Sequence, residues 1–335
     1  MERRDRGERS PSVPPAERMP VRLEELQRRV RDLRQVGAWP QMLEIVGRAA
    51  HREAMVWEFP VTACRAVGGS EEAALPAAAA VFCSVLSIRL VDDILDDDPN
   101  GVYHTLGVGP VANLALAFQA AGHLLLDDPE IPPEMRAKLQ ASFADMSLAT
   151  CFGQSLDTSE ATSETEYWRI VESKTPPLFG AAMQMGALLG GGAVETVDAL
   201  AGIGRVLGRF IQVSDDVTDA LETPARADWK RRGNSLPILY AMTAPHPDRE
   251  EFLRLSLAVE DPGELSAAQK ILLRSGAISY CAMKLLEFSR EIRDLFDRLS
   301  LHEPEVIARL IEIHQRPLRR LLQSVSFKEP AELFF

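Results

Sequence analysis

From about Leu23 onward, apolar residues recur every three or four positions along almost the whole chain. The spacing is clear in "LEELQRRVRDLRQV", "GPVANLALAFQAAGHLLL" and "VDALAGIGRVLGRFIQVSDD", and it returns in "PEVIARLIEIHQRPLRRLLQSV". Such spacing places the apolar side chains on one face of a helix. Strand signals are nearly absent, because no segment alternates apolar and polar residues over more than a few positions. The pattern predicts an all-α protein.

Breaks rich in glycine, proline and acidic residues divide this pattern into roughly ten to twelve helices of ordinary length. They occur at "VGGSEE", "DDDPNG", "DDPEIPPEM", "TSEATSET", "LGGGAVE", "ETPARAD", "APHPDRE" and "EDPGE". No change of composition marks a second domain, so residues 21–335 are predicted to form a single helical domain. Residues 1–20 carry four prolines and almost no apolar periodicity, which predicts a disordered tail.

The charge and the hydropathy exclude several classes of protein. Lysine plus arginine total 37 against 49 aspartates plus glutamates, so the net charge of −12 would repel a nucleic acid. The longest apolar run, Ala73 to Ile88, is interrupted by Pro76 and is too short for an integral membrane segment. There is no apolar stretch typical of a secretory signal, and the four cysteines show no paired spacing. We expect a cytoplasmic protein without disulfides or a structural zinc site.

A block of negative charge follows the most apolar segment directly. In "VDDILDDDPN", Asp92, Asp93 and Asp96 stand at positions i, i+1 and i+4 of the predicted helix, so Asp92 and Asp96 share a face. Carboxylates this close repel one another and lose solvation when they are buried. Taken alone, the cluster is equally compatible with a solvated helix end and with a functional site.

A second cluster repeats this arrangement. "FIQVSDDVTDA" places Asp215, Asp216 and Asp219 at i, i+1 and i+4, again at the end of an apolar helix. Magnesium prefers oxygen ligands, and it typically binds one or two protein carboxylates together with phosphate oxygens and water. Six facing carboxylates without a histidine indicate Mg²⁺ that bridges an oligophosphate. The apolar helices would then line a pocket for a ligand with an apolar tail.

The two clusters resemble the motifs DDxxD and QxxDDxxD of the trans-isoprenyl diphosphate synthase (polyprenyl synthetase) family. Here they read "DDILD" and "QVSDD" followed by Asp219. Between them lie "GQSLD", which contains Gln154, and "ESKTPPLFGAAMQMGA", which contains Lys174 and Thr175, and "DWKRRGNSLPILYA" follows the second motif. The resemblance covers roughly residues 53–241. Because four motifs occur in the family's order, it is specific.

The resemblance implies a single-domain bundle of antiparallel helices around a deep central cavity, commonly assembled as a homodimer. Its chemistry is ionisation of an allylic prenyl diphosphate, in which metal and cationic side chains stabilise the leaving group. Carried over to this sequence, three Mg²⁺ ions would be held by Asp92, Asp93, Asp96, Asp215, Asp216 and Asp219. Lys174, Thr175 and Gln212 would be catalytic, and Lys174 would pair with the diphosphate. Outside this context Lys174 would be a solvated helix lysine and Gln212 a buried amide.

The sequence departs from the family where isopentenyl diphosphate, the second substrate of elongating members, is bound. Trp57, Glu58 and Phe59 stand in place of a basic motif of the type GGKRLRP. Val85 stands where the family has histidine or glutamine, and Gly233 replaces the lysine of GKxT. Burying a diphosphate without cationic partners is costly. We therefore expect the standard isopentenyl diphosphate site to be lost or rebuilt.

Nearby arginines are candidates for a rebuilt site. Arg231 and Arg232 are expected to bind substrate together with Lys174 and Gln154. Arg89 lies one helical turn before the first aspartate cluster. It either belongs to the rebuilt site or neutralises the cluster through a salt bridge.

The leading hypothesis is a Mg²⁺-dependent enzyme that ionises an allylic prenyl diphosphate and transfers the prenyl cation to an acceptor. One alternative is a class I terpene synthase, which would cyclise the same cation or eliminate a proton from it. Another alternative is a non-catalytic subunit of a heteromeric prenyl synthase. Such a subunit is expected to lose aspartates, whereas this chain retains all six.

Overall fold

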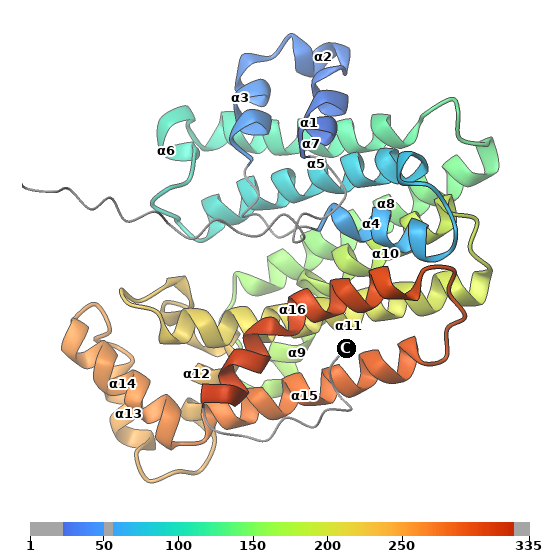
Figure 1. Cartoon of the computed structure of the whole chain (residues 1–335). Helices are drawn as coiled ribbons and strands as arrows, with labels where there is room; N and C mark the ends of the chain where they lie inside the picture. Colours follow the sequence, from blue (N-terminus) through green and yellow to red (C-terminus); the bar gives the residue numbers. More distant parts are fainter. Residues whose placement is uncertain (1–22, 50–55, 325–335) are drawn as a thin grey trace, which may run out of the picture.

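The computed structural model describes residues 23–49 and 56–324 (Figure 1). In chain order the elements are α1 (Leu23–Arg31), α2 (Arg34–Gly37), α3 (Pro40–Arg48), α4 (Glu58–Ala66), α5 (Glu71–Leu95), α6 (Tyr103–Leu106), α7 (Val108–Leu126), α8 (Pro133–Asp157), α9 (Glu164–Lys174), α10 (Pro176–Leu189), α11 (Val194–Leu221), the short 3₁₀ helices η2 (Ala227–Trp229) and η3 (Arg232–Asn234), α12 (Leu236–Thr243), α13 (Arg249–Leu255), α14 (Pro262–Arg274), α15 (Ala277–Phe296) and α16 (Pro304–Ser324).

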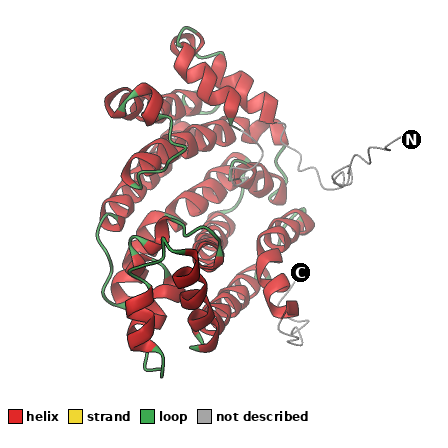
Figure 2. Cartoon of the chain, turned by 90° about the vertical axis from the view of Figure 1, so that its left-hand side faces the viewer, coloured by secondary structure: helices red, strands yellow, loops and turns green. Residues whose placement is uncertain are grey.

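Figure 2 shows that the described part of the chain consists of helices and loops, so the all-α prediction is confirmed. There are more helices than the roughly ten to twelve predicted, because pieces of four residues such as α2 and α6 stand between the long ones. The disordered tail predicted for residues 1–20 lies outside the described residues, and that prediction stays a prediction.

Two clusters of buried apolar side chains form the core, and α4 contributes to both. Phe59 and Ala63 belong to the larger cluster, which extends through α8 to α16. Trp57 and Val61 belong to the smaller one, which is completed by α1, α3, α5 and α7. In Figure 1 the helices of the smaller cluster lie above those of the larger one. The helix α4 therefore joins the two halves of the molecule.

The helix α5 carries the first aspartate cluster out of the core. It begins at Ser70, whose side-chain oxygen accepts a hydrogen bond from the backbone N–H of Ala73. Its alanine-rich middle is fully buried and packs closely against α7. Most side chains of the helix are buried as far as Leu90, and the helix ends at Leu95, shortly before Asp97, which takes a left-handed backbone conformation (φ 55°). The aspartates thus lie where the helix leaves the core.

The helix α11 carries the second cluster and packs against α10 over much of its length. Gly204 permits this close approach, because a Cβ atom there would lie 2.4 Å from the carbonyl oxygen of Phe179. Most of the apolar residues of α11 are buried, and the helix continues unbroken from Val194 to Leu221. The position of its acidic end is therefore fixed by packing along the whole helix.

By length and composition alone, α5 and α7 could each cross a membrane. The apolar window of α5 is 72% buried, as in a core helix, whereas that of α7 is only 33% buried. Core helices of globular proteins meet the same criteria, so this is weak evidence for a membrane segment.

Candidate active site

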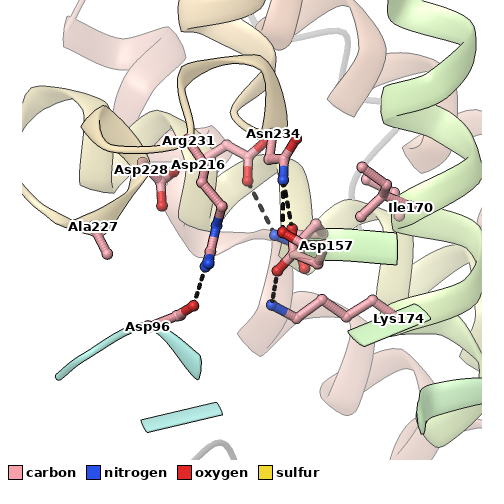
Figure 3. Close-up of a pocket in the computed structure, with 11 residues that line it drawn as sticks. Asp96, Asp157, Ile170, Lys174, Asp216, Ala227, Asp228, Arg231 and Asn234 are labelled. Carbon is pink, nitrogen blue, oxygen red and sulfur yellow. Dashed lines mark hydrogen bonds and ion pairs between the residues drawn. The ribbon is translucent and has the colours of Figure 1, made fainter. Parts of the chain in front are cut away.

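A cavity of about 60 Å³ lies where the ends of α5, α8, α9 and α11 meet the segment that contains η2 and η3 (Figure 3). Its lining residues come from both aspartate clusters and from the motifs between and after them. They are Asp96, Asp157, Ile170, Val171, Lys174, Gln212, Asp216, Ala227, Asp228, Arg231 and Asn234. Segments more than a hundred residues apart in the sequence thus form one polar site.

The first cluster is held by polar and cationic neighbours. Gln154 donates a hydrogen bond from Nε2 to Asp92 Oδ1 at 2.6 Å, and Lys174 Nζ lies 3.3 Å from the same oxygen. Asp96 forms an ion pair with Arg231. Burial and the charge of Asp92 raise the pKa of Asp96, although Arg231 opposes this. The structure thus brings Gln154, Lys174 and Arg231, three of the predicted substrate-binding residues, onto the first motif.

Lys174 lies between two carboxylates at the end of α9. Its Nζ is 2.6 Å from Asp157 Oδ2, in addition to its contact with Asp92. Burial alone would lower the pKa of Lys174, but the two carboxylates outweigh it and raise this pKa above its ordinary value. Lys174 is therefore a fixed positive charge that points into the cavity (Figure 3).

Asp216 is the buried member of the second cluster, with 2% of its surface exposed. Its Oδ2 accepts hydrogen bonds from Tyr167 Oη at 2.7 Å and from the backbone N–H of Leu236 at 2.9 Å. Its Oδ1 accepts one from Gln212 Nε2 at 3.1 Å. Burial raises the pKa of Asp216, and these donors offset only part of that effect. Asp216 thus joins α9, α11 and α12.

Gln212 and Thr175 extend this network. Thr175 Oγ1 donates to Gln212 Oε1 at 2.7 Å, so the amide is fixed at both ends. Gln212 lines the cavity, and Thr175, which does not line it, holds the Gln212 side chain through this hydrogen bond. Of the three predicted catalytic residues, Gln212 contacts the second aspartate cluster directly, Thr175 contacts it through Gln212, and Lys174 contacts the first cluster.

Four of the six aspartates of the motifs do not line the cavity in this structure. Besides Asp92, which contacts Lys174, these are Asp93, Asp215 and Asp219. Asp215 is exposed on α11, and the burial of its surroundings raises its pKa to about 7. Asp93 is half-buried, and burial raises its pKa to about 6. Burial also raises the pKa of Asp219. Burial thus disfavours the ionised form of each of these three.

Two of the predicted substrate-binding arginines also lie outside the cavity lining. The charge of Arg89 opposes the rise that burial causes in the pKa of Asp93, which agrees with the salt-bridge alternative for this exposed residue. Arg232 Nη1 donates to Ser256 Oγ at 3.0 Å, and its Nε lies 3.7 Å from a carboxylate oxygen of Glu160. Arg232 therefore holds its loop against α13 and the turn after α8.

The sequence that contains these motifs can be compared with known protein families. The family model described as polyprenyl synthetase matches residues 52–272, which contain both aspartate clusters and every cavity residue. The chain belongs to the polyprenyl synthetase family. This confirms the resemblance that the motifs indicated.

Curated relatives of this polyprenyl synthetase are prenyltransferases. A short chain isoprenyl diphosphate synthase of Methanothermobacter thermautotrophicus is 29% identical over 251 residues, which cover 70% of this chain and 76% of the relative. A geranylfarnesyl diphosphate synthase of Natronomonas pharaonis is 30% identical over 250 residues, which cover 70% and 72%. The expectation of a prenyltransferase-type enzyme is confirmed.

Solved structures show the same fold. A geranylgeranyl pyrophosphate synthase superposes with a TM-score of 0.78 at 20% identity, covering 89% of this chain and 96% of that one. A decaprenyl diphosphate synthase from Rhodobacter capsulatus superposes with a TM-score of 0.76 at 18% identity, covering 89% and 94%. The isoprenoid synthase type of helical bundle is therefore confirmed.

Several cavity residues of this polyprenyl synthetase did not emerge as site candidates from the sequence. Asp157, Asp228 and Asn234 line the cavity, and Tyr167 contacts it through Asp216. Asp157 stands in "GQSLD", and Asp228 and Asn234 stand in "DWKRRGNSLPILYA". Both motifs contributed to the family resemblance, so the sequence did contain a signal for these three residues. Tyr167 had none, because a tyrosine on an amphipathic helix is usually a packing residue.

The positions that depart from the family's basic motif are part of the core here. Trp57 is 2% exposed and packs edge-on against Phe82, and Phe59 is fully buried against Phe179. Glu58 is 6% exposed, and burial raises its pKa to about 8. This stretch of the polyprenyl synthetase therefore contributes two buried aromatic side chains and one buried carboxyl group.

Proposed function

We propose that this polyprenyl synthetase ionises an allylic prenyl diphosphate with the aid of Mg²⁺ and transfers the prenyl cation to an acceptor. The observation that carries the proposal is the cavity at which Asp96 of the first cluster and Asp216 of the second meet Lys174. A fixed ammonium between two carboxylate groups suits a diphosphate that arrives with divalent cations. The relatives, which are isoprenyl diphosphate synthases, support the same substrate class.

The donor set of the cavity fits a hard divalent cation. The lining residues offer oxygen donors and no histidine or cysteine. In the described ranges, no three acidic, histidine or cysteine side chains already converge into a metal site. Burial raises the pKa values of Asp216 and Asp228, so negative charge in this region is under-compensated. Cations would offset that charge, and the residues that would hold them are the six aspartates of the motifs.

When bound, Mg²⁺ would neutralise the leaving diphosphate and so favour cleavage of the C–O bond. The protein's own contribution begins with Lys174, which Asp157 and Asp92 hold in place at the cavity. Lys174 would supply a positive charge that needs no reorganisation as the diphosphate departs. Arg231 would exchange Asp96 for a phosphate oxygen, since guanidinium groups bind carboxylate and phosphate alike.

We further propose that isopentenyl diphosphate is not bound at its standard place. The supporting observation is the burial of Trp57 and Phe59 in the core, where cations would be required. The same observation favours a second candidate function, in which the cation is cyclised or loses a proton as in class I terpene synthases. A non-catalytic role is disfavoured by the retained aspartates and by Lys174.

The proposal is tested by measuring diphosphate release from C10, C15 and C20 allylic diphosphates. We expect release with Mg²⁺, none with EDTA, and recovery when Mg²⁺ is added back. Lys174→Met should slow release by about 100-fold or more, because one charge-assisted contact in the transition state supplies roughly 3 kcal/mol. Lys138→Met, which changes an exposed lysine on α8, is the matched control. Undiminished release in EDTA would contradict the metal requirement.

We also propose a homodimer that forms through α7 and α8. Leu116 and Leu124 of α7 are 71% and 55% exposed, and Leu148 and Phe152 of α8 are 73% and 49% exposed. These two helices contact each other, so their exposed side chains belong to one region of the surface. A second copy of the chain would bury them.

A cytoplasmic location is supported by the four free cysteines, of which Cys151 is exposed.

A further inference from the structure

The side chain of Asn234 fastens η3 to the turn that follows α8. Its Nδ2 lies 3.0 Å from the backbone oxygen of Asp157, 3.0 Å from Asp157 Oδ1 and 2.9 Å from the backbone oxygen of Ser159, so its two hydrogens are shared among three acceptors. Its Oδ1 accepts one from the backbone N–H of Ala161 at 2.7 Å. The amide thus satisfies backbone groups at the C-terminal end of α8, which that helix leaves unpaired.

This docking also explains why the neighbouring position has no side chain. A Cβ atom on Gly233 would lie 1.8 Å from the carbonyl oxygen of Ala161. The backbone N–H of Gly233 donates to a carboxylate oxygen of Glu160 at 3.2 Å. A lysine at this position, as the family pattern has it, would push η3 away from the turn. Glycine at this position therefore lets η3 lie close against the turn, where a lysine would not fit.

The close fit acts directly on the carboxylate that holds Lys174. Asn234 binds Asp157 Oδ1, and the other oxygen, Oδ2, lies 2.6 Å from Lys174 Nζ. Asp157 stands at the C-terminal end of α8, where the helix dipole disfavours a negative charge. The amide N–H and the ammonium together offset that cost. From Lys174 the chain of contacts continues to Asp92 at 3.3 Å.

We infer that Asn234 is a positioning residue, which acts through Asp157 to hold Lys174 in place for the diphosphate of the substrate. Two routes then connect this loop to the first aspartate cluster. One is the ion pair of Arg231 with Asp96, and the other runs from Asn234 through Asp157 and Lys174. The part of the inference that concerns substrate rests on the proposed function. The effect on Lys174 itself does not.

The test measures the reactivity of Lys174 in the full-length protein. Each variant is treated with an amine-acetylating reagent at mildly alkaline pH, and the labelling of Lys174 is compared with that of exposed Lys138 by mass spectrometry. Asn234→Ala should increase the relative labelling of Lys174 by about three- to ten-fold, because a less firmly held Asp157 leaves the ammonium group more accessible to the reagent. Asn234→Ser should act in the same direction, and it replaces the alanine variant if that variant does not fold. Thr158→Ala, which removes a hydrogen bond within the same turn, should leave the labelling unchanged.

A double-mutant cycle decides whether Asn234 acts through Asp157. Asp157→Asn should increase the labelling at least as much as Asn234→Ala, and the double variant should match Asp157→Asn alone. An Asn234 variant that lowers the melting temperature but leaves Lys174 labelling unchanged would overturn the inference, as would additive effects in the double variant. In parallel, Asn234→Ala should raise the KM for a C15 allylic diphosphate several-fold. If the wild type consumes no allylic diphosphate, the proposed function fails, while the labelling result still decides the role of Asn234.

Discussion

Arg231, in the loop between η2 and η3, forms an ion pair with Asp96, which lies 135 residues earlier at the end of α5. Both residues line the cavity, and Figure 3 shows the contact between them. Because Arg231 is paired with a carboxylate of the first motif, a diphosphate that bound to this guanidinium would take the place of Asp96.

The first prediction concerns the affinity for diphosphate. Arg231→Gln should weaken binding of inorganic diphosphate in the presence of Mg²⁺ by about ten-fold or more, because a charge-assisted contact contributes about 1.5 to 3 kcal/mol. Isothermal titration calorimetry measures this directly. Arg226→Gln is the matched control, since Arg226 lies on the same loop and pairs with Glu222 in an exposed position. Equal affinities for the two variants would contradict a role of Arg231 at the diphosphate.

The second prediction concerns the buried anchor of the second cluster. Tyr167→Phe removes the hydroxyl that donates to Asp216 in a fully buried position. The unfolding free energy at pH 8 should fall by about 1.5 to 3 kcal/mol, because a buried carboxylate loses a donor. Tyr280→Phe removes a similar hydrogen bond to Glu164 at an exposed site, and its cost should stay below about 0.5 kcal/mol. Urea denaturation of both variants checks the difference, and equal losses would contradict the anchoring role.

The helical class and the polar end of the bundle could be predicted because both follow from local spacing. Asp92 and Asp216 stand in motifs whose helical period can be read from the sequence. The prediction that the two motifs meet at one cavity depended on the family resemblance, since spacing alone does not tell which helix ends face each other. The structure supplies that relationship through Asp96 and Asp216.

The roles of individual cations could not be predicted in the same way. Arg231 and Arg232 are adjacent and chemically identical, yet one pairs with Asp96 and the other bonds Ser256 on α13. Their directions depend on how η3 docks onto the turn after α8. That docking rests on Asn234 and on the missing side chain of Gly233, and neither has a periodic signal.

The third prediction concerns the dependence of stability on pH. Burial raises the pKa of Glu58 to about 8, above its ordinary value in the unfolded chain. The folded state therefore binds the proton more tightly, and stability is lost as the pH rises from the ordinary pKa of about 4.5 to the folded-state value of about 8. Between pH 6.5 and 8.5 Glu58→Gln should gain about 1 to 2 kcal/mol of unfolding free energy relative to the wild type. The buried His314, whose pKa is lowered to about 4, affects stability only at lower pH.

Thermal unfolding at pH 6.5, 7.5 and 8.5 in a buffer with EDTA tests this prediction. Glu260→Gln changes an exposed carboxylate and serves as the control, for which we expect the pH dependence of the wild type. A Glu58→Gln variant that tracks the wild type across all three pH values would show that Glu58 is not a buried acid.

The fourth prediction concerns assembly. Leu116→Glu and Leu148→Glu place charges on the exposed apolar region of α7 and α8, and each should convert a dimer into monomers at micromolar concentration. Leu273→Glu, which changes a residue 58% exposed on α14, should leave the dimer intact. Sedimentation velocity measures the masses. A wild type that sediments as a monomer, or a dimer unaffected by all three changes, would contradict this interface.

The central claim is that the enzyme ionises an allylic diphosphate without isopentenyl diphosphate at the standard site. The most direct measurement is the rate of consumption of a C15 allylic diphosphate with Mg²⁺, with and without isopentenyl diphosphate, followed by identification of the products. We predict similar rates in both cases, and products that are hydrocarbons, alcohols or a prenylated acceptor of another kind. Consumption that requires micromolar isopentenyl diphosphate and yields longer prenyl diphosphates would contradict the claim.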